Sequence, residues 1–230
     1  MAVEVDVRWR RVEDDPARLD ELARLLDERE RERAGRRRRP AAFVTAHALL
    51  RSCAAEALGV DPAEVAFERT CATCGSHRHG KPAVVGSDLS VSLSYAGRLA
   101  VVARSWGGEV GVDVEEVEES DFDGFDAVTL DASEVAALAG LEGAGLRLAR
   151  ARVWARKESV LKATGHGLVV DPRQVVVSGP AEPAALRDWL GEHPRTGPVQ
   201  LADVDLDDPQ HVVAVALLAD DAPALTVVSA

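Results

Sequence analysis

The chain has 230 residues with 27 basic and 39 acidic side chains, which gives a formal net charge of −12. Its hydrophobic content of 47% with 29% charged residues is typical of a soluble globular protein and excludes a disordered chain. The acidic balance argues against general nucleic-acid binding, although residues 29–39 hold seven arginines.

The chain also lacks the marks of a membrane or secreted protein. No apolar run approaches the roughly 20 residues that span a bilayer, and the start, MAVEVDVRWR, has no basic segment followed by an apolar one. Three cysteines are an odd number, which argues against a disulfide framework. We therefore expect a cytoplasmic protein that binds no membrane.

The first part of the chain predicts a strand, two helices and three further strands. The opening strand alternates apolar and polar residues, and the first helix carries leucines on one face. The second helix is more apolar and is followed by Gly59, a residue suited to the position after a helix C-terminus. The predicted elements are Val3–Trp9, Pro16 to about Arg33, Ala41–Leu58, Val65–Glu68, Leu89–Ser94 and Leu99–Arg104.

The remainder of the chain repeats this order after Gly107-Gly108. A strand, a short helix, a long helix and further strands follow one another. The repetition predicts an α+β fold of two pseudo-symmetric halves packed side by side, 1–108 and 109–230, with a site in the cleft between them. The predicted elements are 110–116, Ala132–Ala139, about Leu146–Ala163, Gln174–Val177, Val199–Asp205 and His211–Leu218.

Two acidic residues stand in the strand EVGVDVEE. The β-branched residues Val110, Val112 and Val114 share one face, so Asp113 and Glu115 share the other. Neighbouring carboxylates repel each other and lose hydration when they are covered. The pattern therefore predicts a cation that neutralises the two carboxylates.

The long helix contains VWARKESVLKATGHG. A spacing of four places Trp154, Glu158 and Lys162 along one face, whereas Lys157 lies about 100° away and points elsewhere. Alone, Glu158 and Lys162 read as an ordinary helical ion pair. Together with the strand, they complete a set of three carboxylates and a lysine, which suits Mg²⁺ and a phosphate-bearing substrate.

At this point the motifs resemble those of the 4′-phosphopantetheinyl transferases. GVDVEE and WARKESVLK look like the family's G-x-D-x-E and W-x-x-K-E-x-x-x-K, HGKPAV like its G-K-P segment, and SVSLSY like its S-x-S-H-S segment. The resemblance covers about Arg36 to Val177, and the length suggests the larger, Sfp-like class. It implies Mg²⁺-dependent transfer of phosphopantetheine from coenzyme A to a serine of apo acyl or peptidyl carrier proteins, with release of 3′,5′-ADP.

The resemblance also assigns roles to single residues. It implies that Asp113, Glu115 and Glu158 hold the metal, that Lys162 meets the diphosphate, and that Glu158 is the candidate base. It also implies further contacts with coenzyme A. These are made by Arg36, Lys81, Pro82, Ser94 and Tyr95 in the first half and by Lys157 in the second half.

Three features leave alternatives open. Tyr95 stands where the family has histidine and carries no positive charge. Arg36, Arg37 and Arg38 lie in the region where the family places basic residues for the 3′-phosphate, without a residue-by-residue match, or they form a solvated charge run. The apolar residues of Ser120–Ala137 belong either to a carrier-binding surface or, as we prefer, to the core.

The loop TCATCGSHRHGKP has its own alternatives. Cys71, Cys74, His77 and His79 have ligand types that suit a structural Zn²⁺, but the four positions are close together, and a Gly-rich loop with reduced cysteines explains them as well. The first half is expected to contact the adenosine and phosphates of coenzyme A, and the second to hold the metal and the carrier protein. We expect a monomer. The alternative function is a non-catalytic protein that binds coenzyme A or a carrier.

Overall fold

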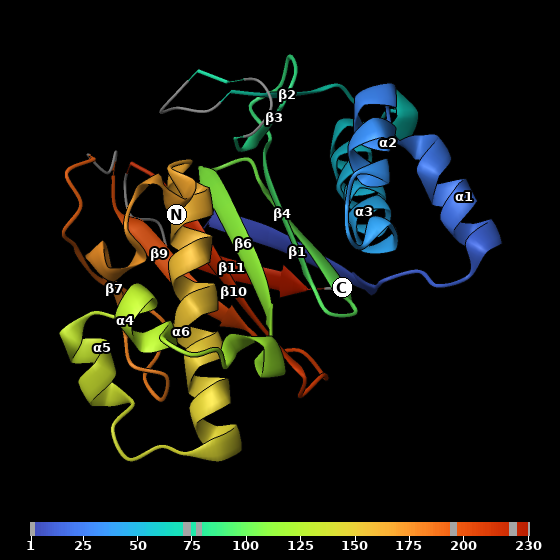
Figure 1. The fold of residues 1–230 in the computed structure, drawn as a ribbon. Helices are drawn as coiled ribbons and strands as arrows, with labels where there is room; N and C mark the ends of the chain where they lie inside the picture. The colour runs from blue at the N-terminus through green and yellow to red at the C-terminus, as the bar shows by residue number, and fades with distance from the viewer. Residues whose placement is uncertain (1–2, 71–74, 77–79, 194–196, 221–224, 230) are drawn as a thin grey trace.

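The computed structural model describes residues 3–70, 75–76, 80–193, 197–220 and 225–229 (Figure 1). Two β-sheets pack face to face, and each has a long helix on its outer side, which confirms the predicted α+β class. Among the described residues, no helix is both long and apolar enough to cross a bilayer.

The first sheet has the strand order β11-β1-β5-β4-β3-β2. All neighbours are antiparallel except β11, which runs parallel to β1. Because β11 comes from the end of the chain, the sheets do not coincide with the ranges 1–108 and 109–230, and that division stays a prediction. The strands are β1 (Val3–Arg11), β2 (Phe67–Arg69), β3 (Pro82–Val84), β4 (Ser90–Ala96), β5 (Leu99–Ser105) and β11 (Leu225–Ser229).

The second sheet is antiparallel with the order β6-β10-β9, so β6 is an edge strand. A separate two-stranded sheet, β7-β8, packs against the long helix α6 (Gly143–Thr164). The strands are β6 (Glu109–Glu116), β7 (Val175–Val177), β8 (Leu186–Trp189), β9 (Val199–Val204) and β10 (His211–Leu218).

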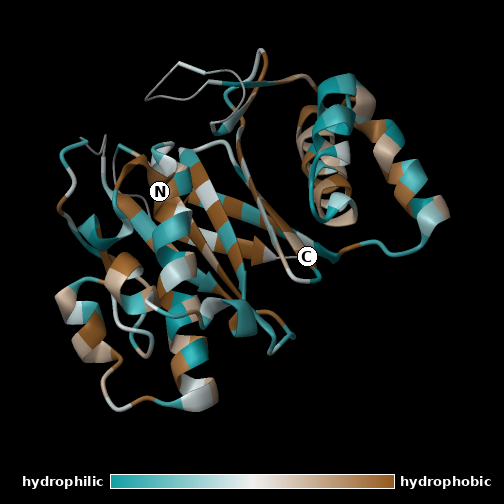
Figure 2. Cartoon of the chain, viewed as in Figure 1, coloured by the Kyte–Doolittle hydropathy of each residue, from teal (hydrophilic) through white to brown (hydrophobic). Residues whose placement is uncertain are grey.

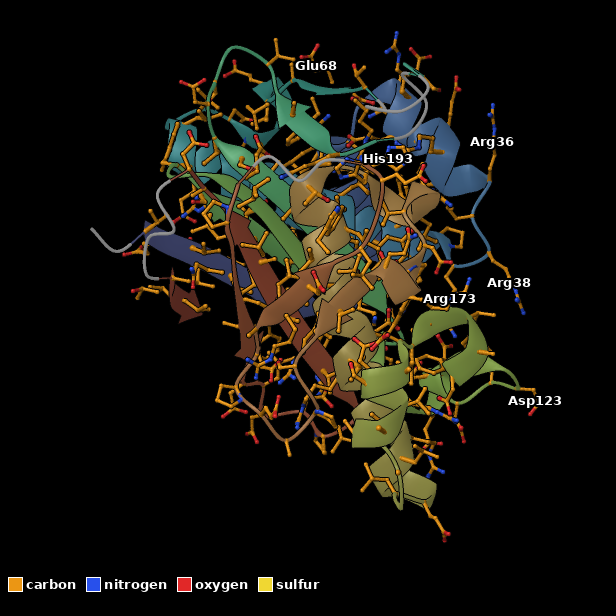
Figure 3. All side chains as sticks on the ribbon, turned by 90° about the vertical axis from the view of Figure 1, so that its left-hand side faces the viewer. Arg36, Arg38, Glu68, Asp123, Arg173 and His193 are labelled. Carbon is orange, nitrogen blue, oxygen red and sulfur yellow. The ribbon has the colours of Figure 1, made fainter. Side chains whose placement is uncertain are left out.

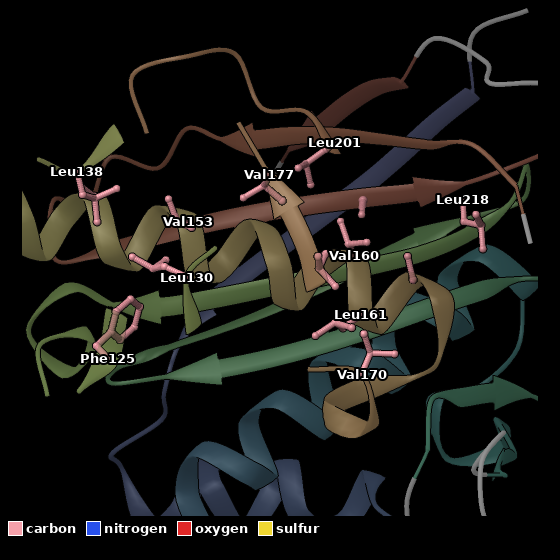
Figure 4. Packing of buried hydrophobic residues seen from close by; sticks show 14 residues of the cluster. Phe125, Leu130, Leu138, Val153, Val160, Leu161, Val170, Val177, Leu201 and Leu218 are labelled. Carbon is pink, nitrogen blue, oxygen red and sulfur yellow. The ribbon is translucent and has the colours of Figure 1, made fainter. Parts of the chain in front are cut away.

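Helices cover both outer faces. On the first sheet, α3 packs its apolar residues against β4 and β5, and α1 and α2 lie outside α3 with their polar faces toward solvent (Figure 2). On the second sheet, α6 packs against β9 and β10 (Figure 4). The helices are α1 (Pro16–Leu25), α2 (Glu28–Gly35), α3 (Pro40–Leu58), α4 (Phe125–Thr129), α5 (Ala132–Ala137) and α6 (Gly143–Thr164), with short 3-10 turns at Pro62–Glu64, Val117–Ser120, Gly167–Val169 and Pro172–Gln174.

The core between the sheets is made mainly of valines. Val5 and Val7 of β1 and Val101 of β5 meet Val112 of β6 and Val215 of β10, and these five residues are 0% exposed. Face-to-face packing of β-branched residues on alternating strand positions is what the sequence pattern of these strands favours. This core fixes the position of β6 and thereby of its acidic face.

The sequence predicted one helix from Pro16 to about Arg33. This prediction was wrong, because the structure has two helices that are separated near the middle of this range. The chain leaves helical geometry at Leu26, and Asp27 begins α2 with a capping box, in which its side chain accepts from Glu30 N while the Glu30 carboxylate accepts from Asp27 N. The D-x-x-E spacing is the sequence signal for this start. The predicted end of α3 is confirmed, since Gly59 adopts φ 70°.

Glu30 holds the arginine-rich helix α2 against α3 through buried polar contacts. Its carboxylate bonds to His47 Nδ1 at 2.8 Å and accepts from Arg51 Nε at 2.7 Å. Burial by itself would raise the pKa of Glu30, but the hydrogen bonds and charges of His47 and Arg51 outweigh it and lower the pKa to about 2.

We expect this carboxylate to make the fold acid-sensitive. Because its folded-state pKa lies below its usual value, its stabilising effect is complete above about pH 4.5 and is lost as the pH falls toward 2. Urea unfolding of the wild type at several pH values should show this loss, and Glu30→Gln should reduce the slope. Glu28→Gln, at an exposed position on the same helix, should keep the wild-type slope. Equal slopes in all three proteins would contradict the assignment.

Candidate active site

Asp113 lies at the centre of β6 and is 3% exposed. Its Oδ1 accepts a hydrogen bond from Ser94 Oγ of β4 at 2.8 Å and lies 2.5 Å from Lys162 Nζ of α6. Lys162 Nζ also bonds to Ser94 Oγ at 2.8 Å. Asp113 Oδ2 is buried and has no hydrogen-bond partner in the described structure. Three elements therefore meet at one carboxylate.

Glu115 and Glu158 complete the acidic group. Burial raises the pKa of Glu115 well above its usual value, the Asp113 charge adds to the effect, and Lys162 opposes it. Burial, followed by the Asp113 charge, likewise raises the pKa of Glu158, again against the effect of Lys162. The Glu158 Oε1 atom is buried without a hydrogen-bond partner in the described residues.

The close approach of α6 to β6 depends on Gly111. A Cβ at this position would lie 2.0 Å from the carbonyl oxygen of Ser159 and 2.3 Å from Ala163 N, both backbone atoms of α6. Any side chain would therefore push the helix away from the strand. The glycine places Glu158 and Lys162 opposite the acidic face of β6.

The donor set fits a hard divalent cation, and two observations support this. All three side chains offer carboxylate oxygens, two of which are buried without partners, and the raised pKa values of Glu115 and Glu158 reflect burial and repulsion that a cation relieves. Within the ranges given above, no three such residues converge into a ready-made metal site. Here the Lys162 ammonium is the contact that neutralises Asp113.

A cavity of about 430 Å³ opens beside this group, and its walls come from both halves of the chain. Glu158 and Lys162 line it together with Lys81, whose Nζ lies 2.5 Å from the Glu109 carboxylate. Burial lowers the pKa of Lys81, while Glu109 works in the opposite direction. Pro82, the next residue, begins β3 and pairs with Arg69 of β2.

A second cavity, of about 730 Å³, lies between α2 and β2 and is rich in arginine. Arg33, Arg36 and Arg69 line it, and Arg69 also lines the first cavity, so the two adjoin. Arg36 and Arg38 project outward from the segment between α2 and α3 (Figure 3), and Arg36 pairs with Glu32 at 3.7 Å. Arg36 is thus placed at the second cavity, not at the carboxylates.

Tyr95 and Lys157 do not join the acidic group. Tyr95 lies on the opposite face of β4 from Ser94, where its ring meets Phe43 of α3 edge to face at 6.5 Å. Lys157 is 0% exposed, with its Nζ 2.6 Å from the Glu134 carboxylate and hydrogen-bonded to the carbonyls of Pro172 and Val175. In this arrangement it ties α6 to α5 and β7, and it has no route to the cavity.

The sequence interpretation missed Gly111, Arg69 and His166 as parts of the site. His166 lines the first cavity, and its ring lies 5.6 Å from that of Trp189 and 5.7 Å from that of His193. For Gly111 the signal was present, since a glycine inside a strand often marks a close backbone approach. For the other two, no local pattern distinguished them.

Of two remaining alternatives, the structure answers the one that concerns residues 120–137. Of the apolar residues in 120–137, Phe125 and Leu130 are buried in the core beside α6, as we preferred, whereas Phe122 and Val128 are 51% and 56% exposed. The proposed zinc ligands, Cys71, Cys74, His77 and His79, lie outside the described residues.

Comparison with known proteins agrees with this geometry. Residues 109–216 match the family model of the 4′-phosphopantetheinyl transferase superfamily, a range that includes Asp113, Glu158 and Lys162. The 4′-phosphopantetheinyl transferase HetI of Nostoc sp. is 31% identical over 192 residues, which cover 78% of this chain and 76% of that protein. The chain therefore belongs to the 4′-phosphopantetheinyl transferase superfamily.

Proposed function

We propose that the protein transfers the 4′-phosphopantetheine group of coenzyme A to a serine of an apo acyl or peptidyl carrier protein in a Mg²⁺-dependent reaction. One observation carries the proposal: Asp113, Glu115, Glu158 and Lys162 gather on facing elements, and the last two line a cavity between the halves. Three carboxylates and a lysine suit a metal-bound diphosphate.

In the proposed reaction, the carrier serine Oγ bonds to the β-phosphorus of coenzyme A. The bond from that phosphorus to the bridging oxygen breaks, and 3′,5′-ADP leaves with the bridging oxygen. Glu158, which lines the cavity, takes the serine proton. Asp113, Glu115 and Glu158 would hold Mg²⁺, which would neutralise charge on the diphosphate.

The basic residues fit the rest of coenzyme A. Lys162, held by Asp113 and Ser94, can stabilise the charge that develops on the 5′-phosphate of the leaving 3′,5′-ADP. Lys81 stands at the other side of the same cavity, where it can meet a phosphate once Glu109 releases it. The adjoining cavity, where Arg33 and Arg36 stand among acidic as well as basic side chains, is the candidate position for the 3′-phosphate.

The experiment is to incubate the protein with coenzyme A, Mg²⁺ and an apo carrier domain and to weigh the carrier by intact mass spectrometry. We expect a gain of one phosphopantetheine that EDTA prevents. Asp113→Asn should abolish the gain, whereas Asp188→Asn, at an exposed carboxylate on β8, should keep it. Coenzyme A binding with no gain on any of several carriers would instead identify a non-catalytic binding protein.

A further inference from the structure

Three serines follow one another at alternate positions of β4, and all three reach β6. Ser90 Oγ accepts a hydrogen bond from Val110 N and Ser92 Oγ from Val112 N, each at 3.0 Å. Ser94 Oγ donates to the Asp113 carboxylate. We call these residues the serine ladder, and the function proposed above assigns a role only to its last member.

The ladder meets a structural requirement of β6. Because β6 is the edge strand of its sheet, the N–H groups on its outer side have no strand to receive them, yet Val110 and Val112 are 0% exposed. Buried N–H groups must find an acceptor. The hydroxyls of Ser90 and Ser92 provide it, because these side chains point from β4 toward β6.

The same contacts also fix how far β6 can slide along β4. Ser90 to Val110 and Ser92 to Val112 are separated by the same number of residues, so the two strands run in one direction and are joined at two successive alternate positions. A slip by one residue would break both bonds, because the N–H groups of the intervening residues of β6 point toward β10. A slip by two residues would offer the hydroxyls other N–H groups but would still move Asp113 out of reach of Ser94. Side-chain hydroxyls therefore set the register that ordinary sheet pairing sets elsewhere.

The ladder reaches the candidate site at both ends. Beyond Ser94 lies the contact with Asp113 and Lys162. At the other end, Ser90 Oγ donates to the Glu109 carboxylate at 2.9 Å, and Glu109 holds Lys81. The two lysines that line the cavity are thus connected through one row of hydroxyls on a single strand.

We propose that Ser90 and Ser92 are positioning residues that hold the metal-binding face of β6 against β4. They set the register in which Asp113 meets Ser94 and Lys162, and they act on the metal through this register without touching it. This inference rests on the proposed metal site. Groups that orient metal ligands typically change metal affinity by 10- to 100-fold when they are removed.

The test measures Mn²⁺ affinity of the full chain by electron paramagnetic resonance, with the metal alone as probe. Ser92→Ala should weaken Mn²⁺ binding by roughly 10-fold or more, and Ser92→Thr, which keeps the hydroxyl, should restore most of it. The matched control is Ser105→Ala. Ser105 is also a buried serine that accepts a backbone N–H, from Gly107 at 3.1 Å, and its hydroxyl also donates to the Glu4 carbonyl. Because neither partner belongs to β6, Mn²⁺ affinity should remain at the wild-type value.

Amide hydrogen exchange of Val112 provides a second readout, and its wild-type part needs no variant. In the wild type this N–H should be protected although β6 is an edge strand, and in Ser92→Ala it should exchange faster. A wild-type protein that binds Mn²⁺ but has a rapidly exchanging Val112, or a Ser92→Ala variant with wild-type Mn²⁺ affinity, would overturn the inference alone. A wild type that does not bind Mn²⁺ would overturn the proposed metal site and the inference with it.

Discussion

Replacing Glu158 by glutamine is expected to reduce the rate of phosphopantetheine transfer by about 10³-fold or more while leaving the fold intact. The substitution keeps the size of a side chain that lines the cavity but removes a carboxylate that we assign to the metal and to the serine proton. Loss of one well-placed electrostatic group in an active site typically costs 10²–10³-fold, and here two roles are lost together.

The same variant should be at least as stable as the wild type. Burial and the Asp113 charge both raise the pKa of Glu158, which means that the ionised form is destabilised in the folded protein. A neutral amide removes this repulsion. We therefore expect single-turnover transfer to fall while the unfolding temperature, measured without metal, stays equal or rises.

The control is Glu142→Gln at the N-cap of the same helix. Glu142 precedes α6 at its N-terminus, is exposed, and makes no side-chain capping hydrogen bond. The net charge changes by the same amount as in Glu158→Gln, so transfer and stability should remain close to the wild type. If Glu158→Gln transferred within about tenfold of the wild-type rate, the carboxylate would have neither assigned role.

Local patterns predicted a large part of this site. The period-2 pattern of β6 correctly separated the valines that enter the core from Asp113, which faces α6 and β4. The period of 3.6 correctly separated Lys157 from the line that leads to Lys162. These relations hold within one element, where backbone geometry alone decides which residues share a face.

The same periodicity argues against treating Ser94 and Tyr95 as one phosphate-binding pair. Adjacent residues of a strand point to opposite faces, so Ser94 reaches Asp113 while Tyr95 turns toward Phe43. Family resemblance named both positions, but the alternation on β4 separates them. The family resemblance indicates which positions to examine. Strand geometry indicates which of these positions can act together.

Long-range pairings could not be predicted in this way. Strand β11 joins the first sheet beside β1, at the other end of the chain, and its five residues carry no sign of that partner. The serine ladder likewise joins two strands of different sheets, and alternate serines on a strand do not by themselves indicate what they contact. Both depend on packing of the whole chain.

Replacing Gly111 by alanine is expected to destabilise the protein by more than about 4 kcal/mol, an exceptional effect for a single methyl group. Steric overpacking usually costs 1–3 kcal/mol because side chains move aside. Here the new Cβ would lie 2.0 Å and 2.3 Å from backbone atoms of Ser159 and Ala163, which can move only if the whole helix moves. Urea unfolding of both proteins measures the difference.

The matched control is Gly145→Ala in the first turn of α6. Its added Cβ would meet no heavy atom within 4 Å, and the residue is helical and exposed. Alanine is favoured over glycine in a helix by about 0.5–1 kcal/mol, so this variant should gain stability. The same substitution on the two facing elements is thus expected to act in opposite directions.

Folded Gly111→Ala protein should also bind Mn²⁺ more weakly. If α6 moves away from β6, it carries Glu158 and Lys162 away from Asp113, and the contact of 2.5 Å between Lys162 and Asp113 is lost. A variant that lost less than about 1 kcal/mol, a typical effect of a single substitution, and kept wild-type Mn²⁺ affinity would show that the strand and the helix are not in backbone contact. In that case the glycine of the G-x-D-x-E pattern would need an explanation other than the close approach of α6.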